Sequence, residues 1–135
     1  MAHLQKSQNA SIINLSSAAG KFGFPNRSPY AAAKWGVIGF TKTLSMELGQ
    51  YGIRVNAILP GTVEGDRSRR VFEAKAQVAG KSMTEIRQAS LSLASIKEMI
   101  QPEQLADIMV FLASPRARTL SGQAISIDSD QQALV

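Results

Sequence analysis

With 135 residues, of which 44% are hydrophobic and 19% charged, the chain has the size and composition of one globular domain. It contains no cysteine, which excludes disulfides, thiolate nucleophiles and cysteine-based metal sites, and we expect no bound metal. The formal net charge is +5, but the basic residues are scattered and are not interleaved with aromatic residues. We therefore expect a solvated basic surface and no nucleic-acid partner. No apolar run reaches the roughly 18 residues of a membrane span, and the first ten residues lack a signal-peptide core, so a cytoplasmic chain without a membrane partner is expected.

The first third of the chain predicts a strand, a loop and a long helix. Residues 10–15 are short, apolar and β-branched, which is typical of a buried strand. Two glycines and two prolines predict a loop over 18–29. Apolar residues at spacings of three and four predict a helix over 28–48, with Gly49 as its stop. Its small residues would let another backbone approach closely, so we expect this helix to pack on more than one side.

The middle of the chain predicts a second strand followed by an irregular segment. Residues 53–59 read as a strand that Pro60 and Gly61 close. Residues 62–101 are charged, rich in serine and alanine, and only moderately periodic. This segment predicts one or two short helices, with Ser82 or Thr84 as a cap. Long segments of this kind commonly cover a substrate site.

The last third of the chain completes an alternating pattern of strands and helices. Residues 102–113 predict a clear helix, with Pro102 in its first turn and an apolar face. Residues 122–128 predict a third strand. Strands that are separated by helices long enough for a crossover indicate a parallel sheet with helices on its faces. The predicted fold class is therefore α/β.

Three sequence features would meet at the carboxyl ends of these strands, where doubly wound sheets bind ligands. They are Ser16 with Ser17, Tyr30 with Lys34, and the segment from Pro60 to Val63. Tyr30 and Lys34 are four residues apart, so their side chains share one helical face. A phenol is a poor acid–base catalyst at neutral pH, and a nearby ammonium favours its ionised form. With a hydroxyl such as that of Ser17 donating to the same substrate oxygen, the set predicts interconversion of a carbonyl and an alcohol.

Each of these features also has an ordinary structural explanation. A Tyr-x-x-x-Lys pair is commonly a solvent-exposed helix pair, two serines satisfy backbone groups at strand ends, and Pro-Gly is a frequent turn. Their order and spacing together favour the functional interpretation. Three arginines in the covering segment are candidates to favour an anionic substrate, although surface arginines are commonplace: Arg67, Arg69 and Arg70.

Four segments of the chain resemble the short-chain dehydrogenase/reductase family. They read INLSSAAG over 13–20, YAAAK over 30–34, IRVNAILPG over 53–61 and GQAISID over 122–128. Bacterial 3-oxoacyl-carrier-protein reductases and sugar or alcohol dehydrogenases are similar to this stretch. The resemblance implies the C-terminal half of a Rossmann-like doubly wound parallel sheet, with about three strands and flanking helices.

The resemblance also implies an activity and a set of roles. It implies an NAD(P)-dependent oxidoreductase, with NAD or NADP as cofactor and a small-molecule carbonyl or alcohol as substrate. Ser17 matches the catalytic serine that polarises the carbonyl. Tyr30 matches the general acid–base and is also expected to contact the nicotinamide end of the cofactor. Lys34 matches the lysine that holds the nicotinamide ribose, and Ser16 is a neighbour of the site. The segment that cradles the nicotinamide ring is matched by Pro60, Gly61 and the backbone of Val63.

The chain departs from the family pattern in ways that bear on function. No two glycines are separated by a single residue, so the Gly-rich turn that holds the cofactor phosphates is absent. We therefore expect a single domain over 1–135 that lacks the dinucleotide-phosphate-binding half. The family's usual Gly-Gly after the last strand is replaced by Ser129 and Asp130. A non-catalytic fragment or assembly partner is the alternative, and the unpaired edge of the 10–15 strand predicts a homo-oligomer.

Overall fold

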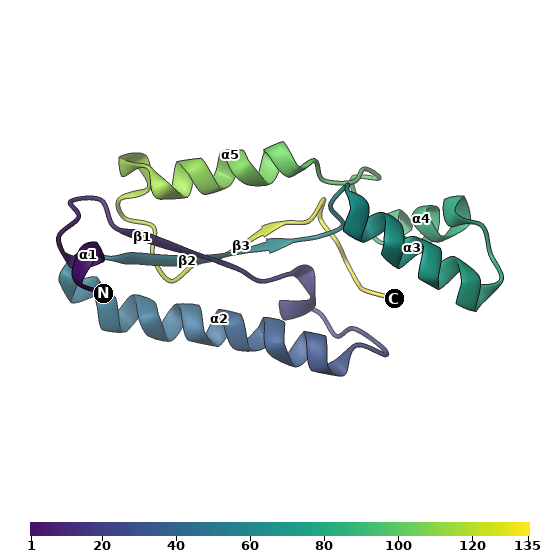
Figure 1. Ribbon diagram of the computed structural model, residues 1–135, viewed down its shortest axis with the longest axis horizontal. Helices are drawn as coiled ribbons and strands as arrows, with labels where there is room; N and C mark the ends of the chain where they lie inside the picture. The colour runs from purple at the N-terminus through teal and green to yellow at the C-terminus, as the bar shows by residue number, and fades with distance from the viewer.

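The computed structural model describes all 135 residues and has three layers, helix, sheet and helix (Figure 1). Three parallel strands form the sheet in the order β1-β2-β3. One face is covered by α2 (Ser28–Leu48) and the other by α5 (Pro102–Ala113). The strands are β1 (Ser11–Leu15), β2 (Arg54–Pro60) and β3 (Ala124–Ile127). The predicted α/β class, with three parallel strands and flanking helices, is confirmed.

The remaining elements lie at the two ends of the sheet. Beyond the carboxyl end of β2, α3 (Asp66–Ala79) and α4 (Met83–Ser92) form a helical pair (Figure 1). The short helix α1 (Ala2–Gln5) was not predicted, and the predicted loop over 18–29 contains a 3-10 turn. The 3-10 turns are η1 (Ala18–Gly20), η2 (Gly49–Tyr51) and η3 (Pro115–Ala117). No helix combines the length and apolar character that crossing a membrane requires.

β2 is the centre of the core, because every one of its residues is buried. Its side chains alternate between the two faces, as the period of a strand requires. Val55 points toward α2 and Ile58 toward α5. The cluster on the α2 side contains Ala10, Leu48, Ile53 and Val55. The cluster on the α5 side contains Ile58, Leu112 and Ala117.

Arg54 is a charged residue at the start of this buried strand, and only 6% of it is exposed. Its guanidinium donates to the side-chain oxygen of Asn9 at 3.0 Å and to three main-chain oxygens at the end of α5 and in η3. Carbonyl groups at a helix C-terminus carry partial negative charge, which compensates a buried cation. Arg54 therefore fixes the start of β2 to the end of α5.

Local sequence signals set the helix boundaries. The predicted ranges of α2 and α5 are confirmed, and a proline lies in the first turn of each. Of the two predicted caps, Ser82 begins α4: its hydroxyl accepts the Glu85 N–H at 3.2 Å, and Glu85 accepts the Ser82 N–H at 2.8 Å. Hydrogen bonds from the Ser82 side chain and backbone lower the pKa of the Glu85 carboxyl. The left-handed glycine that follows α2 is Gly52, with φ 69°, after an additional 3-10 turn.

The outward face of α2 is open in this structure. Within the chain no other element lies against that face, so packing of this helix on more than one side stays a prediction. A Cβ added at Gly36 or Gly39 would meet nothing within 4 Å. Phe40 and Met46 are 57% and 84% exposed. The helix thus packs on the sheet with one side and presents an apolar, small-residue surface with the other.

The turn after β3 has a left-handed backbone conformation that is typical of glycine, although neither of its residues is glycine. Ser129 and Asp130 have φ of 57° and 54°, in the left-handed region that costs other residues roughly 1–2 kcal/mol each. The segment that follows α4 holds the turn: Ser95 N–H and Ile96 N–H donate to its carbonyls at 3.1 Å, and the Ser95 hydroxyl donates to the Asp130 carboxylate. The Ser129 hydroxyl donates to a main-chain oxygen of the same segment at 3.2 Å. The hydrogen bonds offset the backbone strain.

Candidate functional site

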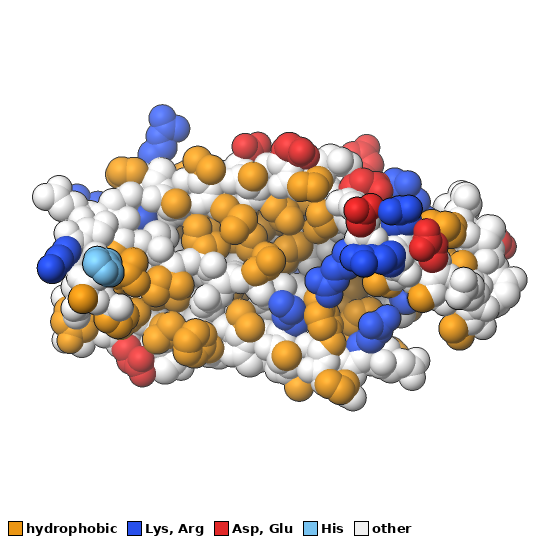
Figure 2. Space-filling view, in the orientation of Figure 1, with side chains coloured by type: hydrophobic (Ala, Val, Ile, Leu, Met, Phe, Trp, Pro, Cys, Tyr) orange, Lys and Arg blue, Asp and Glu red, His pale blue; other side chains and the backbone are white.

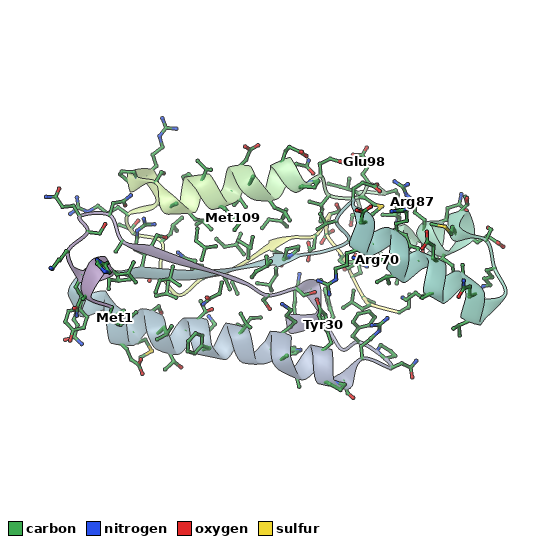
Figure 3. All side chains as sticks on the ribbon, in the orientation of Figure 1. Met1, Tyr30, Arg70, Arg87, Glu98 and Met109 are labelled. Atoms are coloured by element: carbon green, nitrogen blue, oxygen red, sulfur yellow. The ribbon has the colours of Figure 1, made fainter.

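A cavity of about 430 Å³ opens at the carboxyl ends of β1 and β2, beside α3 and α4. Figure 3 places Tyr30 at the end of α2 that faces this region. The structure therefore brings together the residues that the sequence singled out, although they come from three separate elements. All of the predicted site residues line the cavity: Ser17, Tyr30, Lys34, Pro60, Gly61 and Val63.

The two serines that follow β1 have different surroundings. Ser16 is buried, and its hydroxyl donates to the main-chain oxygen of Lys34 at 2.7 Å. The Ser17 hydroxyl accepts the Ala19 N–H at 3.2 Å as the cap of η1, so its own hydrogen is free to donate into the cavity. Ser16 thus holds the helix, and Ser17 is the serine with a hydrogen-bond donor to offer a ligand.

Lys34 links the phenol to the strand end. Its ammonium lies 5.7 Å from the centroid of the Tyr30 ring and donates to the main-chain oxygen of Leu15 at 3.0 Å. Main-chain groups of successive strand residues point to alternate edges, and the N–H of Ser16 bonds to Ile58 in β2. The Leu15 carbonyl therefore points to the outer edge of β1, where no other strand competes for it. The ammonium is held between this carbonyl and the aromatic ring.

Gly20 allows the part of α2 that carries Lys34 to lie against η1. A Cβ at this position would be 2.6 Å from the Ser16 hydroxyl and 2.8 Å from the main-chain oxygen of Lys34. It would also be 2.9 Å from a methyl group of Ile38. Such distances are well inside van der Waals contact, so the position has room for no side chain. η1 and α2 are in direct backbone contact at this point.

The Tyr30 ring lies among an aromatic and two basic side chains. Phe24 meets it edge-on, with 6.5 Å between the ring centroids and an interplanar angle of 76°. The guanidinium of Arg67, which comes from α3, lies 5.9 Å from the ring centroid. Aromatic pairs and cation–π contacts of this kind hold a ring in one orientation. The ring is therefore fixed from the α2 side and from the α3 side.

The turn that follows β2 is held by its backbone. Gly61 N–H donates to Ile127 at 3.0 Å, and a Cβ on Gly61 would be 2.9 Å from the Asp128 Cα, so this close approach requires glycine. Ile100 pairs with the turn through two bonds of 2.9 Å, one from Ile100 N–H to Thr62 and one from Glu64 N–H to Ile100. Val63 lies between these bonds, and its own N–H finds no acceptor in the chain. The Val63 N–H is therefore a free hydrogen-bond donor in the segment that lines the same cavity as Lys34.

Several cavity residues were not found from the sequence. Arg27 and Lys75 line the cavity together with Arg67, whereas Arg69 pairs with Asp66 at 2.8 Å outside it. The spacing of Arg67, Val71 and Lys75 along α3 is the signal that was available, because residues four apart share one helical face. Burial lowers the pKa of the Lys75 ammonium, and the positive charge of Arg27 lowers it further. The C-terminal residues that line the cavity carry no sequence signal: Gln131, Leu134 and Val135.

Comparison with known proteins identifies the relatives of the chain. A family model described as enoyl-(acyl carrier protein) reductase matches residues 1–129. The 3-oxoacyl-[acyl-carrier-protein] reductase of Thermotoga maritima is 37% identical over 126 residues, which are 93% of this chain and 47% of that protein. A short-chain dehydrogenase family protein from Francisella tularensis superposes with a TM-score of 0.85 at 30% identity, over 90% of this chain and 50% of that one.

A third similarity bears on the cofactor. A variant of actinorhodin polyketide ketoreductase, solved with NADPH, has a TM-score of 0.82 and is 34% identical over 88% of this chain and 46% of that chain. The family to which these relatives belong uses NAD or NADP, as predicted. The chain spans about half the length of the curated relatives that it matches. Because these relatives are oxidoreductases, the comparisons favour the oxidoreductase prediction over the non-catalytic alternative.

Proposed function

Because the chain belongs to the short-chain dehydrogenase/reductase family, we propose that it forms the catalytic half of an NAD(P)-dependent enzyme that interconverts a carbonyl and a secondary alcohol. One observation carries the proposal. A hydroxyl, a phenol and an ammonium, those of Ser17, Tyr30 and Lys34, line a single cavity at the carboxyl ends of the strands. Each of the three is held there by contacts with its neighbours.

The proposed mechanism assigns one task to each group. Ser17 donates its free hydrogen to the substrate oxygen and orients the carbonyl. Tyr30 gives its proton to that oxygen during reduction and takes it back during oxidation. Lys34 keeps a positive charge 5.7 Å from the centre of the phenol ring and offers hydrogen-bond donors to the cofactor ribose. When NAD(P) is bound, it supplies the hydride in one direction and accepts it in the other.

Lys34 and the turn over 60–63 would hold the nicotinamide end of the cofactor. The ammonium of Lys34 can donate to the ribose hydroxyls, and the free N–H of Val63 can donate to the carboxamide. The sequence contains no G-x-G turn, whose open amides would bind the pyrophosphate. The proposed contribution of these residues is therefore to place the nicotinamide ring and to leave phosphate binding to another segment.

Replacing Lys34 with methionine tests this assignment in a protein that joins the chain to a dinucleotide-binding half. Cofactor affinity is expected to fall about tenfold to a hundredfold, because hydrogen bonds to a charged group are lost. Cofactor titration measures the effect.

Lys42→Met is the matched control, since Lys42 lies on the same helix and donates only to an exposed main-chain oxygen at 3.3 Å. It should leave the affinity nearly unchanged. A Lys34→Met protein with the parent's cofactor affinity would show that Lys34 has a structural role only.

We also propose that the chain self-associates through the open face of α2 and the outer edge of β1. On the face drawn in Figure 2, hydrophobic side chains gather between α2 and α5. The exposed residues include Leu15 on β1 and Phe40 and Met46 on α2. An unpaired strand edge with apolar neighbours favours pairing with another copy.

Replacing Phe40 with glutamate should shift the chain toward the monomer, because a carboxylate in an apolar interface loses its hydration without gaining a partner. Light scattering across a concentration series measures the effect. Val78→Glu on α3 is the control, because Val78 is 91% exposed and lies outside the proposed interface. A parent chain that stays monomeric, or equal shifts in both variants, would contradict this interface.

A further inference from the structure

The cavity carries uncompensated positive charge. Four basic side chains line it: Arg27, Lys34, Arg67 and Lys75. The only acidic side chain in the lining is that of Glu64, which is paired with Arg87 at 3.0 Å. None of the four cations forms an ion pair with an acidic side chain. If Lys34 serves the cofactor ribose, three cations are left for another ligand.

Of these three cations, one on α3 lies beside the phenol ring and a second on α3 lies beside the neighbouring Phe24 ring. Arg67 and Lys75 are eight residues apart and lie on the helical face that lines the cavity. The Arg67 guanidinium is 5.9 Å from the centroid of the Tyr30 ring, and the Lys75 ammonium is 5.7 Å from that of Phe24. Figure 2 shows Lys and Arg side chains gathered where α3 meets the strand ends. The positive charge is therefore beside the proposed reacting group.

Arg27 also lines this cavity, and it comes from the segment that precedes α2. It flanks the N-terminus of α2, three residues before Tyr30, and its charge contributes to the lowered pKa of Lys75. Lys75 is also partly buried and donates to an oxygen of Val135 at 2.7 Å. In the 135-residue chain this oxygen belongs to the terminal carboxylate, which compensates part of the Lys75 charge. Like charges held together in this way repel each other, and an anion bound between them removes the repulsion.

We propose that the substrate of the Tyr30 site carries a carboxylate or a phosphate, and that Arg67, Lys75 and Arg27 bind this group. Guanidinium groups bind both anions through paired hydrogen bonds, which fix orientation as well as position. An anion held beside Tyr30 would direct the substrate's carbonyl or alcohol carbon toward the phenol and the Ser17 hydroxyl. The inference rests on the proposed function, because it concerns the substrate of the same cavity.

Direct binding to the purified chain, without cofactor or turnover, tests the proposal. Two pairs of probes each compare a ketone that carries an anionic group with a neutral counterpart: acetoacetate with its methyl ester, and dihydroxyacetone phosphate with dihydroxyacetone. Calorimetry or NMR titration should find that at least one anion binds about tenfold or more tightly than its neutral counterpart. The tighter of the two anions then distinguishes a carboxylate from a phosphate substrate. Equal affinities within both pairs would overturn the proposal.

Variants of α3 locate the binding site. Arg67→Gln should weaken binding of the anion about tenfold and leave the neutral probe unaffected. Arg69→Gln is the control, because it removes the same charge from the opposite side of the helix and should change the affinity less than twofold. Equal losses in the two variants would show a general charge effect and overturn the assignment. If Arg67→Gln fails to fold by circular dichroism, Lys75→Gln and the charged and neutral pairs still decide the question.

The proposed function fails by a different result. A chain that binds the anion as described but catalyses no hydride transfer when joined to a dinucleotide-binding half would contradict the proposed function alone. A joined protein that reduces neutral carbonyls, and that binds each anionic probe no more tightly than its neutral counterpart, would contradict only the anion site.

Discussion

Replacing Tyr30 with phenylalanine is expected to slow carbonyl reduction by a factor of about 10²–10⁴, because the change removes the proposed proton donor and nothing else. The substitution keeps the ring, and with it the contacts to Phe24, Lys34 and Arg67. Cofactor affinity should therefore stay within a few-fold of the parent. The measurement requires a protein that joins the chain to a dinucleotide-binding half, with the rate of NAD(P)H oxidation and the cofactor affinity determined on the same sample.

The chain supplies a matched control in its only other tyrosine. Tyr51 lies in the 3-10 turn that follows α2, at the far end of that helix, and is 49% exposed. Tyr51→Phe removes the same hydroxyl from the protein and should leave turnover unchanged. Turnover of the Tyr30→Phe protein within a factor of a few of the parent would rule out Tyr30 as the acid–base group.

Replacing Gly20 with alanine is expected to cost about 1–3 kcal/mol of stability, as overpacking in a dense region does. The new methyl group would meet the main-chain oxygen of Lys34 at 2.8 Å, which cannot move without moving α2. It would also separate the Ser16 hydroxyl from that oxygen and break their 2.7 Å hydrogen bond. Because α2 carries Tyr30 and Lys34, the displacement should lower turnover as well as the free energy of unfolding. Chemical denaturation and a rate assay measure the two effects.

Gly23→Ala provides the comparison for this prediction. Gly23 lies three residues further along, and a Cβ there would meet nothing within 4 Å. It should be nearly neutral in both measurements. If the two variants unfold at the same denaturant concentration, the contact between Gly20 and α2 is not the constraint that the geometry indicates.

Periodicity and motif order were enough to predict most of the fold. The ranges of α2 and α5 follow from apolar spacing and early prolines, and each is reproduced in the structure. Topology predicts that Ser17 and Tyr30 share a cavity. Ser17 follows the end of a parallel strand, and Tyr30 lies at the start of the helix that packs behind that strand. These features are local in the sequence or are fixed by the sheet.

What the sequence did not reveal depends on contacts between distant segments. Arg54 reads as an ordinary strand residue, and its buried position is possible only because the end of α5 supplies carbonyl acceptors more than 50 residues later. Lys75 reads as part of a charged, solvated helix until α3 is folded over Phe24. In both residues, the environment of the charge is set by the partner element and not by the neighbouring sequence.

The turn at Ser129 and Asp130 joins two parts of the cavity wall. The segment that follows α4 is bonded to this turn, and Gln132 N–H donates to Leu93 at 2.7 Å immediately beyond it. Leu93 lines the cavity from the α4 side, and Leu134 lines it from the C-terminal tail.

The start of the tail is therefore bound to the segment that follows α4 by several hydrogen bonds, and it leaves that segment only when they break. A substitution that weakens the turn at Ser129 and Asp130 should consequently disturb the α4 side and the C-terminal side of the cavity wall together.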